Sequence, residues 1–174
     1  MTQPVYGRIK AGRAPFINSA GKYLVCGELR RRDVTAEPGP ANDGRIVLPN
    51  CEAVTVRIKV KTSATRNGWV WMAQEGGTLF RELAQKDFTV LVDLGDNSQT
   101  VEYFVVQTRE IERELRREHA EWLKAPPRRG RAHSRNNRMH RIGYDPMQLK
   151  WLEQYRSWQP VVAAIGMSQG RVQR

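Results

Sequence analysis

Residues 54–61 alternate apolar and charged side chains in a pattern that can place several cations against phosphate groups. Every second residue is Val or Ile, and the positions between them include Arg57, Lys59 and Lys61. A period of two predicts a strand with one buried face. At a rise of roughly 3.3 Å per residue, the cations on the other face lie about 6–7 Å apart. Such a row repels itself unless an anion binds along it, so it favours phosphate; a solvated strand face with nearby acids is the alternative.

A second set of cations is concentrated between residues 124 and 141, where the chain has seven Lys and Arg residues and no acid. The segment has few apolar residues, so we expect a basic loop or a flexible arm. Arginine suits phosphate better than lysine does, and cations without acids suit contacts along a nucleic-acid backbone. The residues that we expect to make such contacts are Arg128, Arg129, Arg131, Arg135 and Arg138. A solvated arm without a specific partner is the alternative.

Two tryptophans, Trp69 and Trp71, follow Arg66 in a short apolar segment that predicts a strand. Indole rings beside a cation can stack on nucleobases. Arg66 therefore joins Arg57 and Lys59 as a candidate for nucleic-acid binding. The alternative is that both indole rings belong to the protein core.

The composition of the whole chain agrees with a polyanionic partner. The 174 residues include 29 Lys and Arg against 18 Asp and Glu, which gives a net charge of +11. This charge favours nucleic acid ahead of a membrane surface, and we expect DNA ahead of RNA. We see no apolar run long enough to cross a bilayer and no secretory signal. Cys26 and Cys51 are interpreted as reduced thiols, so we expect a cytoplasmic protein; a homodimer is left open.

The elements that must position these residues follow from the apolar spacing. A helix at 19–32 is apolar on most sides, which predicts burial. Strands are predicted at 54–61, 69–72, 88–94 and 101–107, with a short helix after Thr78. Further helices are predicted at 109–124, capped by Thr108, and after Asp145, which is a typical N-cap before proline. The predicted organisation is a flexible segment at 1–17, a single domain at 18–160 and a tail at 161–174.

This order of elements predicts an α/β (α+β) fold with a mixed central sheet of four or five strands flanked by helices. Residues 54–61 and 88–94 should form neighbouring strands, and the helices at 19–32 and 109–124 should flank the sheet. Residues 88–94 are almost continuously apolar, which is typical of a strand buried on both faces.

Two segments resemble the PD-(D/E)XK nuclease superfamily, in its small bacterial and phage branch. They are Gly27-Glu28-Leu29-Arg30-Arg31-Arg32 and Ile58-Lys59-Val60-Lys61-Thr62-Ser63. In that branch the strand commonly ends in a Gln-Val-Lys-Thr-Ser type sequence. The resemblance covers roughly residues 17–160 and lies in the order and spacing of short motifs. It implies a restriction-endonuclease-like core.

The resemblance also implies phosphodiester hydrolysis assisted by Mg²⁺. In such enzymes acids on neighbouring strands hold the metal, and a lysine two residues further on orients or deprotonates the attacking water. Lys61 matches that lysine. Lys59 stands where the family has Glu or Gln, and an ammonium group cannot bind a metal. Arg45 lies at or near the position of the first acid, and Asp43, two residues earlier, is the candidate metal ligand that could replace it.

Glu28 is the acid on the first helix that could assist, and pairing with Arg30, Arg31 or Arg32 is the alternative. The catalytic candidates are thus Lys61, Asp43 and Glu28, with Mg²⁺ as the cofactor if the protein is active. The departures at the metal-ligand positions favour a nucleic-acid-binding protein on a nuclease-like fold, with catalysis weak or lost. The alternatives are an active Mg²⁺-dependent endonuclease with displaced ligands and an accessory or regulatory nucleoprotein factor without catalysis.

Overall fold

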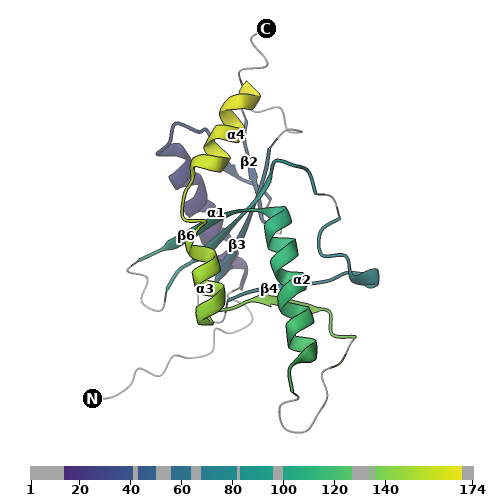
Figure 1. The fold of residues 1–174 in the computed structure, drawn as a ribbon. Helices are drawn as coiled ribbons and strands as arrows, with labels where there is room; N and C mark the ends of the chain where they lie inside the picture. Colours follow the sequence, from purple (N-terminus) through teal and green to yellow (C-terminus); the bar gives the residue numbers. More distant parts are fainter. Residues whose placement is uncertain are drawn as a thin grey trace, which may run out of the picture.

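A five-stranded mixed sheet lies at the centre of the fold (Figure 1). The computed structural model describes residues 14–40, 43–49, 56–63, 68–81, 83–95, 100–126, 134 and 136–169. The strands of the sheet, in their spatial order, are β1 (Glu37–Pro38), β2 (Arg45–Val47), β3 (Arg57–Ser63), β5 (Asp87–Asp93) and β6 (Glu102–Gln107). β3 and β5 run parallel, whereas the other neighbouring pairs of this sheet are antiparallel.

The two parallel strands form the middle of the sheet. All seven residues of β5 are buried, as its nearly continuous apolar sequence predicts. β3 lies beside it, with Lys59 opposite Thr89 and Lys61 opposite Leu91. On β3 the apolar side chains are buried, while Lys59 is exposed and Lys61 is half-buried. The two faces of β3 therefore differ in chemistry.

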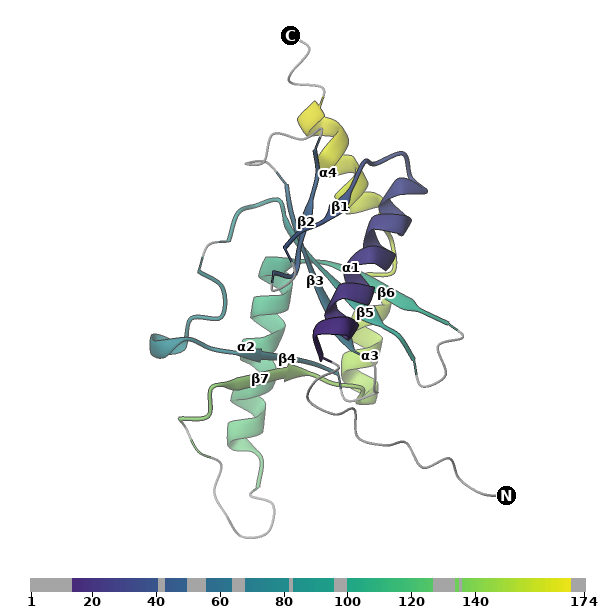
Figure 2. The ribbon, with the colours of Figure 1, turned by 180° about the vertical axis from the view of Figure 1, so that it is seen from behind.

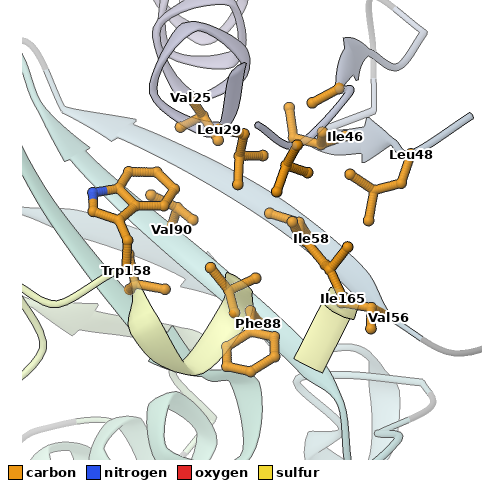
Figure 3. Close-up of a cluster of buried hydrophobic side chains, with 14 of the residues drawn as sticks. Val25, Leu29, Ile46, Leu48, Val56, Ile58, Phe88, Val90, Trp158 and Ile165 are labelled. Atoms are coloured by element: carbon orange, nitrogen blue, oxygen red, sulfur yellow. The ribbon is translucent and has the colours of Figure 1, made fainter. Parts of the chain in front are cut away.

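Two helices cover the face of the sheet that carries Ile58 and Val60, which we call the α1 face. These helices are α1 (Ala14–Arg30) and α4 (Gln159–Gln169). Val25 and Leu29 of α1 meet Ile165 of α4 in one buried cluster with apolar residues of β2, β3 and β5 (Figure 3). This cluster is the larger part of the core.

The opposite face, which we call the α2 face, carries Leu91 and Phe104 into a second buried cluster. The elements in this layer are α2 (Thr108–Lys124), α3 (Pro146–Glu153) and a two-stranded antiparallel sheet of β4 (Trp69–Met72) and β7 (Met139–Ile142). Ile111 and Leu115 of α2 and Leu152 of α3 complete this cluster. The β4–β7 pair lies across the C-terminal half of α2 (Figures 1 and 2).

The predicted fold class is confirmed, since a mixed five-stranded sheet is flanked by helices. The strands predicted at 54–61 and 88–94 are neighbours, as β3 and β5; residues 54 and 55 lie outside the described residues. The helix predicted at 109–124 is α2. Asp145 is the N-cap of α3, and its carboxylate accepts a hydrogen bond from Gln148 N at 3.1 Å.

Several predicted boundaries and caps are wrong. α1 begins at Ala14, inside the segment predicted to be flexible, and residues 159–169 form α4 where a tail was predicted from 161. Thr78 does not begin a helix, because its own backbone is extended and directly follows a 3₁₀ turn at Glu75–Gly77. Thr108 is not the cap of α2, because Gln107 is the N-cap and the Thr108 hydroxyl lies 3.0 Å from that of Thr89.

The basic loop predicted at 124–141 contains regular structure at both ends. Lys124 is the last residue of α2, and Met139–Ile142 forms β7. β7 pairs with β4, with Trp71 opposite His140. The strand predicted at 69–72 is therefore confirmed as β4, but it belongs to the two-stranded sheet and not to the central sheet.

Candidate nucleic-acid interface

Two neighbouring strands place four cations on the α2 face, and one of them, Arg57, is paired with Asp87. Arg45 of β2 is the register partner of Lys59 on β3. Lys61 lies two residues further along β3, so its side chain leaves the strand on the same face. The paired residues Ile46 and Ile58 point the other way, into the core cluster of the α1 face. We call Arg45, Lys59 and Lys61 the β2–β3 cation cluster.

The two lysines of this cluster differ in exposure. Lys59 is exposed, and its ammonium nitrogen lies 5.9 Å from the centroid of the Phe80 ring. Lys61 is half-buried, with its nitrogen 5.3 Å from the centroid of the Trp71 ring. Burial lowers the pKa of Lys61, because removing water from the ammonium group disfavours its charged form. An anion bound beside Lys61 would favour its charged form again.

Asp43 lies at the edge of this cluster. The hydrogen bond from Val60 N to Gly44 O, at 2.6 Å, continues the β2–β3 register. Asp43 directly precedes Gly44, so it lies at the end of the strand pair toward Lys61. The Asp43 carboxylate accepts a hydrogen bond from Arg45 N at 3.1 Å and forms an ion pair with the Arg45 guanidinium. The fold thus brings Asp43 and Lys61 to one end of the two strands, with Asp43 already paired.

A buried lysine that the sequence analysis did not select holds the loop before β2. Lys22 of α1 is 3% exposed. Its Nζ donates to the carbonyl oxygens of Gly39 at 2.8 Å, Pro40 at 2.7 Å and Asp43 at 3.1 Å. These carbonyls replace the water around the ammonium group. The sequence feature that could have identified Lys22 is its position as a charged residue within a helix that is apolar on most sides.

Glu28 lies on the opposite side of the sheet from Lys61, because α1 packs on the α1 face. Its carboxylate accepts hydrogen bonds from Arg31 at 3.0 Å and Arg32 at 2.6 Å. Burial by itself raises the pKa of Glu28, but the bonds and charges of Arg32 and Arg31 hold it below its ordinary value. The interpretation of Glu28 as an arginine partner is confirmed, and the structure does not bring it to the β2–β3 cation cluster.

Arg57, the first cation of the predicted row, is held by an ion pair. Its Nε and Nη2 donate to the two carboxylate oxygens of Asp87 at 2.7 and 2.6 Å. Asp87 is buried and also accepts a hydrogen bond from Ala84 N at 2.9 Å. This bidentate pair joins β3 to β5. We therefore leave Arg57 out of the interface that we propose below.

Trp69 and Trp71 belong to the core, as their alternative interpretation states. They are 1% and 9% exposed. The Trp69 indole donates to Val92 O at 3.2 Å, and its ring stacks on Tyr144 with centroids 5.4 Å apart. Neither ring has a face available for a nucleobase, although Trp71 supports Lys61.

The remaining predicted cations lie in or near the basic segment. Arg138 is exposed, and its Nε donates to Ala73 O at 2.8 Å, which ties the start of β7 to the end of β4. The other candidates lie outside the described residues; these are Arg66, Arg128, Arg129, Arg131 and Arg135.

The donor groups around Lys61 do not fit Mg²⁺. This ion prefers an octahedral set of carboxylate, phosphate and water oxygens. The β2–β3 cation cluster consists of three cations, and the carboxylate at its edge, that of Asp43, is already paired with Arg45. Across the described ranges, no group of three or more His, Cys, Asp or Glu residues is placed to hold a metal ion. The chemistry of this surface suits an anion.

Comparison with known proteins does not supply a function. No family model, curated protein or solved structure matches this chain. The resemblance to the PD-(D/E)XK nucleases therefore stays a prediction that rests on short motifs. In the part of the chain that the structure describes, no helix is both long and apolar enough to cross a membrane.

Proposed function

We propose that this protein binds nucleic acid through the β2–β3 cation cluster and the basic segment at 124–141, with phosphodiester cleavage weak or lost. The observation that carries the proposal is the charge of the cluster, in which two neighbouring strands bring three cations together with one carboxylate, that of Asp43, beside them. A phosphate bound beside Lys59 and Lys61 relieves their mutual repulsion. It also offsets the cost of the half-buried charge on Lys61.

The three cations have different tasks in this proposal. Lys59 is exposed and makes the first contact with a phosphate oxygen. Lys61 is held against the Trp71 ring, so it loses little conformational freedom when an anion binds. Arg45 already pairs with Asp43 and contributes chiefly by directing that carboxylate away from the lysines.

The basic segment adds backbone contacts of a less specific kind. Seven cations without an acid between residues 124 and 141 supply +7 of the net charge of +11. Contacts from such a segment position a protein on nucleic acid without reading its sequence. We expect DNA as the partner ahead of RNA.

Asp43 supports a second candidate function, a Mg²⁺-dependent endonuclease. The favouring observation is that Asp43 precedes β2 at the end of the strand pair toward Lys61, because the resemblance gives these two residues the roles of metal ligand and catalytic lysine. Lys59 opposes this function, since it places an ammonium group where a metal ligand would stand. We rank this function below simple binding for that reason.

Binding is tested by fluorescence anisotropy with a short labelled DNA duplex. We expect Lys59→Ala and Lys61→Ala each to weaken binding by about tenfold, which corresponds to about 1.4 kcal/mol for a hydrogen bond to a charged group. Lys150→Ala is the matched control, because it removes the same charge from an exposed position of α3. Equal affinities for all three variants and the unmodified protein would refute the interface.

Cleavage is tested in the same preparation with supercoiled plasmid and with RNA, in the presence of Mg²⁺ or Mn²⁺. We expect nicking to be absent or feeble. Robust cleavage that is lost in both Asp43→Ala and Lys61→Ala, but kept in Glu75→Ala, would instead establish the endonuclease.

A further inference from the structure

The two-stranded sheet of β4 and β7 has one buried face and one face that points to solvent. Side chains alternate between the two faces of a strand, and the inward tryptophans of β4 belong to the buried cluster of the α2 face. The outward positions are Val70, Met72, Met139 and Arg141, which we call the β4–β7 outer face. In Figure 2 the strand pair lies in front of α2, which contacts β7 from the inner side. The outer face is therefore not covered by α2.

Three of the four residues of the β4–β7 outer face are apolar and exposed. Met72 is 60% exposed, Met139 48% and Val70 36%. The register places Met72 opposite Met139 and Val70 opposite Arg141, so the apolar side chains form one patch. An antiparallel sheet that packs on the core with one face normally has polar side chains on the other. Apolar side chains gathered beside charged ones are typical of a binding surface, and methionine adapts its shape to a partner.

Charge indicates what kind of partner this face binds. Arg141 is exposed, its guanidinium lies beside Gly143 just past the end of β7, and it also lines a cavity of about 380 Å³ between α2, β7 and α3. Arg138 is exposed directly before β7 and is tied to the end of β4 by its hydrogen bond to a carbonyl group. An arginine thus stands at each end of β7, with the apolar patch between. The acids nearest in sequence, Glu75 and Asp145, lie outside the two strands.

This arrangement favours a polyanion over a second copy of the chain. An interface between two copies with twofold symmetry pairs each surface with itself. It would bring the arginines of both outer faces together, and the two basic segments with them. Duplex DNA instead offers phosphates on either side of a groove whose floor carries apolar groups.

The dimensions of the strand pair fit the major groove. Two paired strands lie about 4.8 Å apart, and four residues span about 10 Å, which is the length of about three base pairs. The major groove is about 12 Å wide and admits a two-stranded ribbon, whereas the minor groove is about 6 Å wide. Methionine and valine side chains cannot donate hydrogen bonds to base edges, so the group that they can cover in the major groove is the methyl group of thymine.

We propose that the β4–β7 outer face lies in the major groove of duplex DNA, where Met72 and Met139 cover thymine methyl groups and Arg138 and Arg141 contact phosphates. The inference rests on the proposed nucleic-acid binding and adds a groove and a preference for A·T pairs. It also gives a reason for DNA ahead of RNA, because the major groove of an RNA helix is deep and narrow and side chains cannot read it.

The probe is a short labelled duplex of alternating A·T pairs, compared with the same duplex in which deoxyuridine replaces every thymidine. This replacement removes the methyl groups and leaves the charge and the hydrogen-bonding edges of the bases unchanged. The unmodified protein should bind the thymine duplex more tightly by about fourfold for each methyl group that it covers, the effect of burying one such group. Arg141→Gln should weaken binding of both duplexes alike.

Met72→Gln/Met139→Gln should bind the two duplexes equally. Glutamine keeps the length of the side chain, and both positions are exposed, so the free energy of unfolding should change little. Met147→Gln is the matched control, because it makes the same chemical change on α3, where Met147 is 72% exposed. This control should keep the full preference for the thymine duplex.

Equal affinities of the unmodified protein for the two duplexes would overturn the major-groove inference and leave nucleic-acid binding intact. A preference that survives in Met72→Gln/Met139→Gln would overturn it as well, because the methyl groups would then be read by another surface. Loss of a dimer in that variant, measured by sedimentation and without any preference for thymine, would make the outer face a protein interface instead. Failure of both duplexes to bind at low salt would overturn the proposed function itself.

Discussion

Lys61 keeps its ammonium group half-buried over the Trp71 ring, where no carboxylate of the described residues pairs with it. Burial lowers its pKa, so the folded state carries a cost for holding the charge. Residues that bind ligands commonly reduce the stability of the free protein. For Lys61, the stability lost by burying the charge and the affinity gained by binding nucleic acid can be measured separately.

We predict that Lys61→Met stabilises the free protein while it weakens nucleic-acid binding. Methionine keeps an aliphatic chain of similar length against Trp71 and removes the desolvated charge. The expected gain in the free energy of unfolding is about 0.5–1 kcal/mol at neutral pH, measured by urea denaturation. Lys59→Met, at an exposed position of the same strand, should change stability much less.

The direction of the pH dependence follows from the lowered pKa of Lys61. Below its pKa in the folded state, both the folded and the unfolded chain carry the proton, so the full cost is present. The cost disappears as the pH rises through that value toward the ordinary pKa of 10.5, because only the unfolded chain then keeps the proton. The advantage of Lys61→Met should shrink over that range. A variant less stable than the unmodified protein at neutral pH would contradict the prediction.

The sequence predicted where these charged residues lie on the strand but not how they are paired. A period of two was enough to put Lys59 and Lys61 on one face. It could not reveal that Arg57 pairs with Asp87, because that acid comes from a strand thirty residues away in sequence. The hydrogen bonds from Lys22 to three carbonyl groups could not be predicted for the same reason, since those carbonyls belong to a loop that folds back on α1.

At the scale of elements, the distance between α1 and β3 is set by a glycine. A Cβ added at Gly21 would lie 1.9 Å from Thr62 Oγ1, which is far closer than any allowed contact. Thr62 directly follows Lys61 on β3. The absence of a side chain at position 21 therefore lets the helix pack closely on the strand that carries the β2–β3 cation cluster.

We predict that Gly21→Ala lowers the free energy of unfolding by about 1–3 kcal/mol, the usual effect of overpacking. This loss exceeds the gain of about 1 kcal/mol that alanine brings to a helix interior. Adding Thr62→Ala should restore most of the loss, because the three nearest atoms all belong to Thr62. Urea denaturation of the single and double variants measures both effects.

Gly27 provides the matched control for this prediction. It lies in the same helix, and a Cβ there would meet nothing within 4 Å. Gly27→Ala should therefore be neutral or stabilising by up to about 1 kcal/mol. If Gly21→Ala proved as stable as Gly27→Ala, the close contact between α1 and β3 would be wrong.

Elements with strong local patterns were predictable, and elements made by distant pairing were not. β5 was recognisable from its continuous apolar run, and α2 from its helical spacing. The β4–β7 sheet was missed because its strands lie about 70 residues apart and one follows a basic segment. The sequence predicts a tail where α4 forms, because this segment has no charged residue to mark an amphipathic helix; in the structure Val161 and Ile165 are buried against the α1 face.

At the scale of the whole molecule, the net charge is unevenly distributed. The glutamates of α2 pair with arginines of the same helix, as in Glu110–Arg113 at 2.8 Å and Glu112–Arg116 at 2.7 Å, so this helix adds little net charge. The basic segment at 124–141 supplies +7 of the net charge of +11, and residues 1–27 add four cations without an acid. The charge balance predicts an anionic partner from the sequence, but the cavity between α2, β7 and α3 could not be predicted, because three separate elements assemble it.

The salt dependence of duplex binding measures how many phosphates the β2–β3 cation cluster and the basic segment contact. Each phosphate contact contributes about −0.9 to the slope of log K against log salt concentration on duplex DNA. The measurement compares the unmodified protein with Lys59→Ala/Lys61→Ala and with a variant that has glutamine at five positions of the basic segment. Those five positions are Arg128, Arg129, Arg131, Arg135 and Arg138. The double lysine variant should have a slope shallower by about 1–2 units, and the five-arginine variant a slope shallower by several units. Equal slopes for the three proteins, or no binding by the unmodified protein at low salt, would contradict the account.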